Sequence, residues 1–293
     1  MKIEVFTPAT TANLGPGFDV LGAALTLRNR FVVATGRAGF RLSGLAEGEE
    51  LRPNLFLVAM EAAAEALGRA LPPVGVTCRA GIPVRSGLGS SASATCGGIL
   101  AAEALLGERL PPAEELALAS RIEGHPDNAA ACLLGGLTIA TRDGLVRRLP
   151  APDLAAIVFY PGTEVGTQES RLALLRVVPR SDAVFNLGHA GLLVYALIQK
   201  EYGLLGEACQ DRLHEPQRLS LCPLALEARE AALRAGAYAV PISGSGPSVI
   251  ALTPPAAGAR VTAALRRIAR RHSRARVFPL RFSEEGARAQ VVE

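Results

Sequence analysis

The sequence predicts an α+β protein built from two domains. The chain has 293 residues, whereas a single domain holds about 100–200 residues. Stretches rich in Val, Ile and Phe alternate with alanine-rich helical patterns along the chain. The two prolines of Pro150-Ala151-Pro152 mark a change of pattern. We therefore expect an N-terminal domain at residues 1–152 and a C-terminal domain at residues 153–293.

The first half mixes predicted strands with predicted helices. Strands are expected at short stretches enriched in β-branched and aromatic residues: Ile3–Phe6, Arg28–Thr35, Phe40–Leu42, Val74–Cys78 and Leu137–Ala140. Helices are expected where alanine and other small residues dominate: Asn54–Leu67, Ala92–Leu106 and Glu114–Ile122. Gly68 and Gly107 stand where the first two helices should end. The pattern is that of an α+β domain.

The second half has a more regular order. Its predicted strands are Ala155–Tyr160, Tyr238–Pro241, Ser248–Leu252 and Ala275–Leu280. Its predicted helices begin near Glu169 and span Leu187–Ala208, Leu224–Arg234 and Ala257–Arg271. This succession of strand, helices, two strands, helix and strand suits a split βαβ, ferredoxin-like sandwich.

Composition excludes several classes of protein. Apolar residues make up 49% and charged residues 20% of the chain, which excludes wholesale disorder, collagen and coiled coil. The 31 basic and 27 acidic residues leave a net charge of +4, too mild to imply nucleic acid. The five cysteines are scattered and never spaced as CxxC, so neither a disulfide framework nor a zinc site is expected.

No targeting or membrane segment is expected. Glu4 stands where a signal peptide keeps an apolar stretch. The uncharged run Ala235–Ala259 contains four prolines, which a spanning helix would not tolerate. Ala183–Gln199 falls short of the ~20 apolar residues that a span needs, and we expect a buried helix there. The prediction is a soluble, cytoplasmic protein without a membrane partner.

The most informative segment is Ile82–Ser93, whose residues Ser86–Ser91 we call the glycine–serine loop. Gly87 and Gly89 allow tight turns that expose backbone N–H groups, and a predicted helix follows at once. A helix N-terminus carries about half a positive charge, so the segment suits an anion such as phosphate. It matches neither the Walker motif nor the dinucleotide fingerprint. A plain turn with a serine cap is the structural alternative.

The string resembles the nucleotide loop of the GHMP kinases, a superfamily that includes galactokinases, homoserine kinases and mevalonate kinases. Arg85 departs from the pattern, which usually has a small residue there. The resemblance implies that ATP is the cofactor and that Asn54 lies near its nucleoside. It also implies that the nucleotide is held by Pro83, Ser86, Gly87, Leu88, Gly89, Ser90, Ser91, Ala92 and Ser93.

Further motifs narrow the resemblance. Thr7–Gly22 is expected to be a strand end that runs into a loop dense in glycine and proline, which presents one amide and one carboxylate. Glu123–Asn128 is expected to be a loop with four polar groups, and loops this polar between apolar elements usually serve a site. Asp211–Arg218 and Ser243–Ser248 follow in the second half. These blocks, in this order, are similar to the homoserine kinase family. The resemblance implies ATP-dependent phosphorylation of the side-chain hydroxyl of L-homoserine, a step of threonine biosynthesis, with Mg²⁺ held by Ser91 and Glu123.

The substrate carries an ammonium, a carboxylate and a hydroxyl. Asn13, Asp19 and His125 suit the ammonium and the hydroxyl, and Arg171 and Arg218 suit the carboxylate because a guanidinium binds it through two hydrogen bonds. The resemblance places Thr167 beside the transferred group and Asn128 at the hydroxyl, in place of a strong base. Asp127 is the alternative base, although a capping role is favoured for it; His214 is expected to brace the segment of Arg218.

The resemblance also sets the expected architecture and its rivals. It implies an N-terminal domain like one ribosomal-protein domain, with a left-handed crossover, a ferredoxin-like C-terminal domain, the site between them and a homodimer. One rival is a kinase of mevalonate or shikimate, substrates that lack the ammonium. The other is an RNA-binding protein on a ribosomal-protein-like fold, suggested by an arginine cluster at 266–276, but the chain has only 4% aromatic residues for base stacking.

Overall fold

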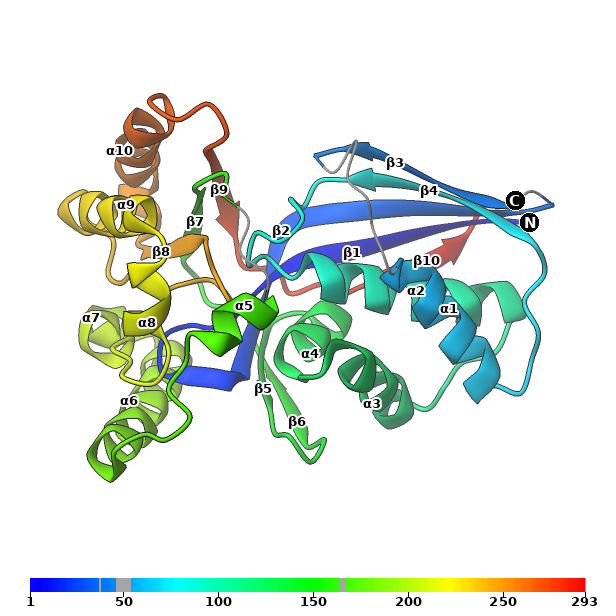
Figure 1. Cartoon of the computed structure of the whole chain (residues 1–293), viewed down its shortest axis with the longest axis horizontal. Helices are drawn as coiled ribbons and strands as arrows, with labels where there is room; N and C mark the ends of the chain where they lie inside the picture. The colour runs from blue at the N-terminus through cyan, green and yellow to red at the C-terminus, as the bar shows by residue number, and fades with distance from the viewer. Residues whose placement is uncertain (37, 46–53, 164–166, 293) are drawn as a thin grey trace.

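The chain folds into two helix-on-sheet units that lie side by side (Figure 1). The computed structural model describes residues 1–36, 38–45, 54–163 and 167–292. Over these residues the strands form one sheet of seven strands and one of three. The α+β class predicted from the sequence is therefore confirmed.

The large sheet is built on two long strands, β1 (Lys2–Asn13) and β2 (Gly17–Thr35), paired antiparallel with Val5 opposite Phe31. The strand order is β10-β1-β2-β4-β3, and β5 and β6 extend β2 beyond its bend. The remaining strands are β3 (Gly39–Gly44), β4 (Val74–Ala80), β5 (Leu137–Ala140), β6 (Val146–Leu149) and β10 (Arg288–Val291). In the first part of β1, Lys2–Phe6, burial alternates, as a sheet with one covered face requires, whereas every residue from Thr7 to Asn13 is buried.

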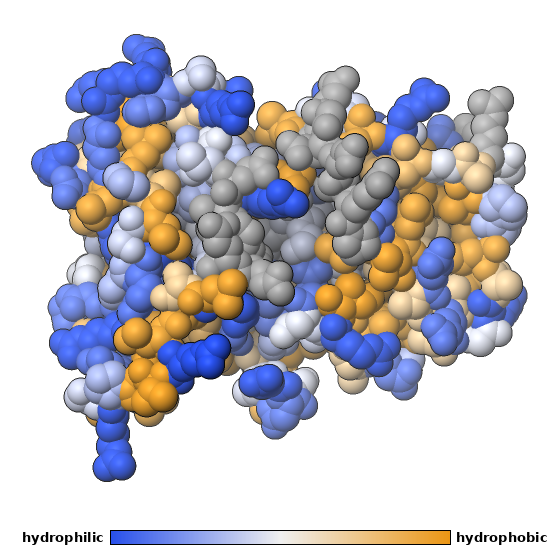
Figure 2. All heavy atoms as spheres, in the orientation of Figure 1, coloured by the Kyte–Doolittle hydropathy of each residue, from blue (hydrophilic) through white to orange (hydrophobic). Residues whose placement is uncertain are grey.

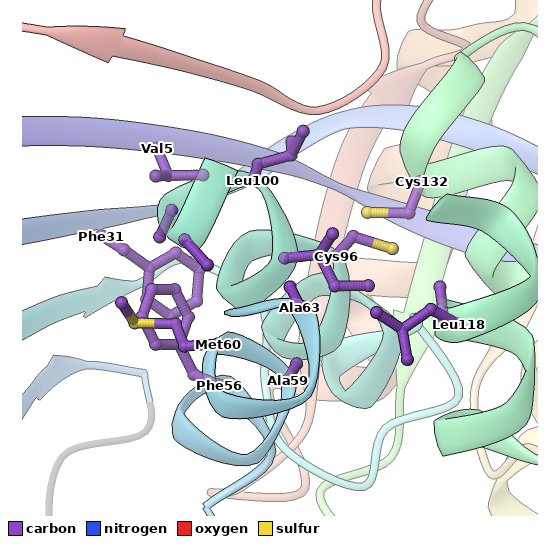
Figure 3. Close-up of a cluster of buried hydrophobic side chains, with 14 of the residues drawn as sticks. Val5, Phe31, Phe56, Ala59, Met60, Ala63, Cys96, Leu100, Leu118 and Cys132 are labelled. Atoms are coloured by element: carbon purple, nitrogen blue, oxygen red, sulfur yellow. The ribbon is translucent and has the colours of Figure 1, made fainter. Parts of the chain in front are cut away.

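Four helices cover one face of this sheet: α1 (Leu55–Ala66), α2 (Ser90–Leu106), α3 (Pro112–Glu123) and α4 (Asp127–Leu134). Figure 3 shows the core between them, in which the rings of Phe31 and Phe56 stack at 4.4 Å. Burying one such side chain stabilises the fold by about 1.5–3 kcal/mol. Gly97 and Gly98 of α2 let this helix pass close to Phe31 and Phe56, so its small residues are a packing requirement.

The second unit packs helices on a three-stranded antiparallel sheet of order β8-β7-β9, built from β7 (Ala155–Tyr160), β8 (Val249–Thr253) and β9 (Arg276–Arg281). Its helices are α5 (Thr167–Leu172), α6 (Arg180–Gln199), α7 (Leu205–Ala208), α8 (Glu215–Ser220), α9 (Pro223–Arg234) and α10 (Gly258–Ala269), with short 3₁₀ turns at Tyr202–Leu204 and Pro255–Ala257. The strand expected at Tyr238–Pro241 is absent from the described chain, where isolated bridges at Ala239 and Ile242 replace it. The left-handed crossover stays a prediction.

The two units are joined both by strand pairing and by a shared apolar core. Strand β10, from the C-terminal end, pairs with β1, with Ile3 opposite Val291. A buried cluster combines residues of the bend in β2, such as Leu25, with residues of the second unit, such as Val158 and Leu193. The predicted domain boundary at residue 152 therefore stays a prediction. Hydrogen bonds and apolar contacts connect residues on either side of that boundary.

Several predicted boundaries need correction. The helix predicted at Leu187–Ala208 starts earlier, at Arg180, and ends at Gln199, because Lys200 takes a left-handed conformation with φ of 59°. Thr7–Gly22 is the meeting point of β1 and β2, joined by a short turn, rather than a loop. The predicted loop Glu123–Asn128 is shorter than expected, since Asp127 and Asn128 already belong to α4.

Helix α6 is not the buried helix that the sequence predicts. Leu193, Ala196 and Leu197 are buried, but Val184 and Leu187 are 61% and 75% exposed. In the described part of the chain, α6 is the one helix whose length and apolar composition would suffice to cross a membrane. Core helices of soluble proteins meet the same criterion, and this helix packs one face into the buried cluster that contains residues of both units.

Candidate active site

A cavity of about 300 Å³ opens between the two units. Its polar lining comes from β1, β2, the glycine–serine loop, α4, α5, α8 and the turn after Ser243: Asn13, Asp19, Arg85, Ser86, Gly87, Gly89, Ser90, Ser91, His125, Asp127, Asn128, Arg171, Arg218, Gly244 and Ser245. The structure thus brings together side chains from four sequence motifs that lie far apart along the chain. One cavity receives most of the residues that the sequence analysis singled out.

The glycine–serine loop is wedged between β1 and the turn after Ser243. At Gly87, with φ of 78°, a Cβ atom would lie 2.3 Å from the Ser243 carbonyl oxygen. At Gly89, with φ of 66°, it would lie 1.9 Å from Thr10 Oγ1. The Ser243 hydroxyl donates to the Gly87 carbonyl at 2.8 Å. Glycine is required at both positions because of the backbone conformation and the close approach.

The loop carries backbone donors beside the cavity, which Gly87 and Gly89 line. In the described part of the chain, the N–H groups of Gly87, Leu88 and Gly89 have no hydrogen-bond acceptor. They precede α2, a helix of 17 residues whose N-terminal dipole adds to the attraction for an anion. Unpaired N–H groups beside a helix N-terminus form a site that phosphate oxygens fill.

Not all of the predicted nucleotide residues face the cavity. Of the described residues, Ser86, Gly87, Gly89, Ser90, Ser91 and Asn54 line it, whereas Pro83, Leu88, Ala92 and Ser93 lie behind it. The Ser93 hydroxyl is fully buried and bonded to Thr7 and Asn29. The Ser86 hydroxyl donates to the Pro83 carbonyl. These side chains hold the shape of the loop, and any contact of theirs with nucleotide stays a prediction.

Glu123 and Ser91 lie side by side at the start of α2. The Ser91 hydroxyl donates to Glu123 Oε2 at 2.7 Å, and the Thr95 hydroxyl donates to Oε1 at 2.6 Å. Burial raises the pKa of the Glu123 carboxyl, although the two hydroxyls partly oppose the shift. A carboxylate with hydroxyl neighbours, and with no cationic side chain bonded to it among the residues that the structure describes, is a donor set of hard oxygens, which fits Mg²⁺.

His125, Asp127 and Asn128 form a hydrogen-bonded group at the start of α4. Asp127 Oδ1 accepts from His125 Nδ1 at 2.7 Å, and from the backbone N–H of Asn128 at 2.7 Å. Burial alone would lower the pKa of the His125 imidazole, but the hydrogen bond and charge of Asp127 outweigh it and raise the pKa. Thr10 donates to Asn128 Oδ1 at 2.6 Å. Asp127 is thus engaged as an acceptor, and because it is the first residue of α4 rather than its N-cap, the capping role stays a prediction.

Two residues assigned to opposite ends of the substrate are paired with each other. Arg171 donates to both carboxylate oxygens of Asp19, at 3.0 and 2.8 Å. Asn13 Oδ1 accepts from the backbone N–H of Asp19 and so holds the turn between β1 and β2. This ion pair joins β2 to α5 across the cavity. Thr167 is the first residue of α5, and its side chain lies outside the described residues.

Arg218 is the most unusual charge at the site. Only 5% of the residue is exposed, yet it lines the cavity. Its Nε has no hydrogen-bond partner among the described residues. Burial, followed by the charge of Arg171, lowers the pKa of its guanidinium to about 10, so it stays charged at neutral pH. A buried cation without a bonded carboxylate is costly unless a ligand supplies one.

The sequence analysis missed the apolar end of the cavity. Its walls come from β2, β3, α1 and β4 and the segment after it: Phe31, Phe40, Leu42, Leu55, Phe56, Cys78, Ala80, Ile82 and Val84. Asn54 lies at this end and caps α1 by accepting from the Leu57 N–H. Asn29 was also missed, because Arg28 and Arg30 flank it and no local pattern sets it apart; it accepts from the N–H groups of Gly81 and Ile82.

Comparison with known proteins identifies the family. The profile described as GHMP kinases N terminal domain matches residues 54–136, and that described as GHMP kinases C terminal matches residues 193–270. A homoserine kinase of Prochlorococcus marinus (strain MIT 9313) is 43% identical over 279 residues, with 90% of this chain and 87% of the relative covered. The chain belongs to the homoserine kinase family of GHMP kinases. A relative from Gloeobacter violaceus, also named homoserine kinase, is 45% identical over 259 residues, covering 85% of this chain and 87% of the relative.

A solved structure supports the same family. The crystal structure of homoserine kinase from Cytophaga hutchinsonii superimposes with a TM-score of 0.87 at 31% identity, covering 99% of this chain and 97% of that one. The two-domain GHMP kinase fold is thereby confirmed. Membership of a kinase family makes ATP the expected phosphoryl donor and disfavours the RNA-binding alternative.

Proposed function

We propose that this protein transfers the γ-phosphoryl group of ATP to the side-chain hydroxyl of L-homoserine, giving O-phospho-L-homoserine and ADP in threonine biosynthesis. The observation that carries the proposal is the pairing of two complementary sites in one cavity. The N–H groups of Gly87–Gly89, which have no acceptor among the described residues, suit the phosphates. The buried Arg218, to which no described carboxylate is bonded, suits the carboxylate of an amino acid.

The charged end of the substrate binds between β2, α5 and α8 in this proposal. The carboxylate of homoserine pairs with Arg218 and Arg171, and the ammonium pairs with Asp19 and the carbonyl groups near Asn13. The present ion pair of Arg171 with Asp19 opens in the process, and each partner receives a new partner of opposite charge from the zwitterion. Mevalonate and shikimate lack the ammonium and would leave Asp19 unpaired, which favours the amino acid.

The phosphate end of the site acts through position and charge. Ser91 and Glu123 would hold Mg²⁺, which neutralises charge on the phosphates when it is bound. The donors of the glycine–serine loop orient the terminal phosphate toward the hydroxyl of homoserine. In-line alignment of this kind, rather than covalent help from the protein, supplies most of the acceleration in phosphoryl transfer. Asn54 and the apolar walls beside it receive the nucleoside.

No strong base is assigned to the hydroxyl. Asn128 lines the cavity beside His125, and we assign it to orienting the hydroxyl while the proton leaves to phosphate or water. Asp127 already accepts three hydrogen bonds through one oxygen, from His125 and from the backbone and side chain of Asn128. A carboxylate engaged in this way orients its neighbours more readily than it removes a proton.

A coupled assay of ADP release tests the proposal. Homoserine, threonine, mevalonate and shikimate are offered in turn with ATP and Mg²⁺. We expect turnover with homoserine to exceed turnover with mevalonate and with shikimate by at least about tenfold, because each of these would leave a charged group of the site unpaired, at a cost well over 1.4 kcal/mol. Comparable or faster turnover with mevalonate or shikimate would contradict the proposed substrate.

We also propose that the protein acts as a cytoplasmic homodimer. Apolar side chains gather on the surface over α6 (Figure 2), where Val184, Leu187, Tyr195 and Ile198 are 47–75% exposed. These positions are symmetric about Gly191, whose missing side chain leaves open space.

Two α6 helices could therefore pair antiparallel across a twofold axis. Sedimentation should show a dimer that Leu187→Glu dissociates and Leu145→Glu, on the exposed β5–β6 turn, does not; a monomeric parent protein would refute the pairing.

A further inference from the structure

The bonding partners of Arg218 share one property: they are electrically neutral. Its Nη1 donates to the Gly244 carbonyl at 3.2 Å and lies 3.2 Å from His214 Nδ1. The guanidinium stands 5.2 Å from the ring centre of Phe18. In the described part of the chain no carboxylate forms an ion pair with it. The positive charge is therefore held in place without being neutralised by its direct contacts.

The geometry fixes the protonation of His214. Its Nε2 lies 2.8 Å from the Gly15 carbonyl oxygen, which can only accept, so Nε2 carries the hydrogen. Nδ1 then has a lone pair and accepts from Arg218. The ring is fully buried and stacks on Phe18 at 5.0 Å. Burial lowers the pKa of this imidazole, although the charges of Asp211, 3.8 Å from Nε2, and Glu215 oppose the shift, and the lowered pKa favours the neutral ring.

The same contacts connect three parts of the substrate site. His214 reaches the turn between β1 and β2 through Gly15, and that turn lies between Asn13 of β1 and Asp19 of β2. The Gly244 carbonyl accepts from both Asn13 Nδ2, at 2.7 Å, and Arg218. The ring of His214 is thus a rigid link between the turn that is proposed to bind the ammonium and the arginine that is proposed to bind the carboxylate.

We infer that His214 is a positioning residue for the substrate. Its anchored ring offers Arg218 a neutral hydrogen-bond acceptor and so orients the guanidinium toward the cavity. Because the acceptor is neutral, the positive charge of Arg218 is left for the carboxylate of the bound amino acid. The inference rests on the proposed function. An acidic residue in this place would hold the guanidinium equally well but would neutralise it. The lone pair of Nδ1 is what distinguishes this role from simple bracing.

Two substitutions separate the hydrogen bonds of the ring. His214→Asn keeps an acceptor near the position of Nδ1 but cannot reach Gly15. His214→Gln keeps a donor near the position of Nε2 but loses the acceptor for Arg218. We expect the glutamine variant to raise the KM for homoserine about tenfold to hundredfold, the range for a lost hydrogen bond to a charged group. The asparagine variant should stay within about threefold, and the KM for ATP should change less than about twofold in both.

Steady-state kinetics with each substrate varied, and thermal unfolding of every variant, decide the matter. His272→Asn and His272→Gln, at an exposed histidine remote from the cavity, are the matched controls. A larger rise for asparagine than for glutamine would show that anchoring to Gly15, not the acceptor for Arg218, is what matters. If the asparagine variant does not fold, an unchanged homoserine KM in a folded glutamine variant also overturns the inference. A parent enzyme inactive on homoserine would instead refute the proposed function.

Discussion

At the scale of single residues, the site is defined by charges that lack their final partners. Arg218 has no bonded carboxylate and Glu123 has no bonded cation among the described residues, while Arg171 and Asp19 are bonded to each other. Such arrangements are unfavourable in an empty protein and become favourable when a ligand of opposite charge arrives. The residues that matter for binding are therefore visible as electrostatic anomalies.

The first prediction concerns Arg171. Replacing it with alanine should raise the KM for homoserine by about tenfold or more, since a charge-assisted hydrogen bond to the carboxylate is lost. The KM for ATP should stay within about twofold. Arg212→Ala is the control, because Arg212 is exposed and stacks on Phe185 outside the cavity. An unchanged homoserine KM in Arg171→Ala would remove this residue from the site.

The second prediction concerns Glu123. The isosteric change Glu123→Gln keeps the hydrogen bonds to Ser91 and Thr95 possible but removes the charge proposed to hold Mg²⁺. We expect kcat to fall by about two to four orders of magnitude, the cost of losing electrostatic stabilisation of phosphoryl transfer. The Mg²⁺ concentration for half-maximal rate should rise as well. Turnover near that of the parent enzyme would be incompatible with the metal role, and Glu108→Gln, in an exposed ion pair with Arg69, serves as control.

At the scale of helices and strands, buried acids in the packing of α2 against α3 make stability depend on pH. Burial, and next the charge of Glu103, raise the pKa of the Glu115 carboxyl from 4.5 to about 7. The folded protein therefore keeps this proton over a range in which the unfolded chain releases it. The contribution of the protonated Glu115 to the free energy of unfolding is therefore fully present below about pH 4.5, and it is lost as the pH rises through about 7.

The third prediction follows from this linkage. Glu115→Gln is neutral at every pH, so its free energy of unfolding should fall less than that of the parent between pH 4.5 and about pH 7. The difference can reach about 3 kcal/mol, at about 1.4 kcal/mol for each pKa unit. Urea unfolding at pH 5 and at pH 7.5 measures it. The exposed neighbour Glu114→Gln should behave like the parent, and parallel pH profiles for the Glu115 variant and the parent would contradict the buried-acid explanation.

Element boundaries also show where sequence patterns stop being informative. Helices α1, α2 and α3 match their predictions within about two residues, since alanine-rich segments and closing glycines are strong local signals. Helix α4 was missed, because it is short and its first residues are the polar Asp127 and Asn128. Strand β10 was missed because its pairing with β1 spans nearly the whole chain. Long-range pairing leaves no local pattern to read.

At the scale of the whole molecule, a shared core ties the two units together. Leu25 of β2 is fully buried in a cluster that also contains Leu193 and Phe282 of the second half. The two units should therefore unfold as one cooperative unit, even though the sequence divides into two domains.

The fourth prediction tests this coupling. Leu25→Ala should lower the free energy of unfolding by about 2–5 kcal/mol, through lost transfer energy and a cavity. Both the parent and the variant should show a single urea transition. Val20→Ala, at a partly exposed position of the same strand, should change stability by less than about 1 kcal/mol. Two separated transitions in the parent protein would contradict the shared core.

The sequence by itself determined the class of fold, the family resemblance and the glycine–serine loop, because these depend on residues that are close together in the chain. It also named Asp19, Glu123, Arg171 and Arg218 as site residues, and the cavity brings all but Glu123 into its lining. Only the tertiary structure decided which partners these charged groups have. Arg171 forms an ion pair with Asp19, Glu123 accepts a hydrogen bond from Ser91, and Arg218 is hydrogen-bonded to His214. Contacts between distant segments depend on packing, and no local pattern encodes them.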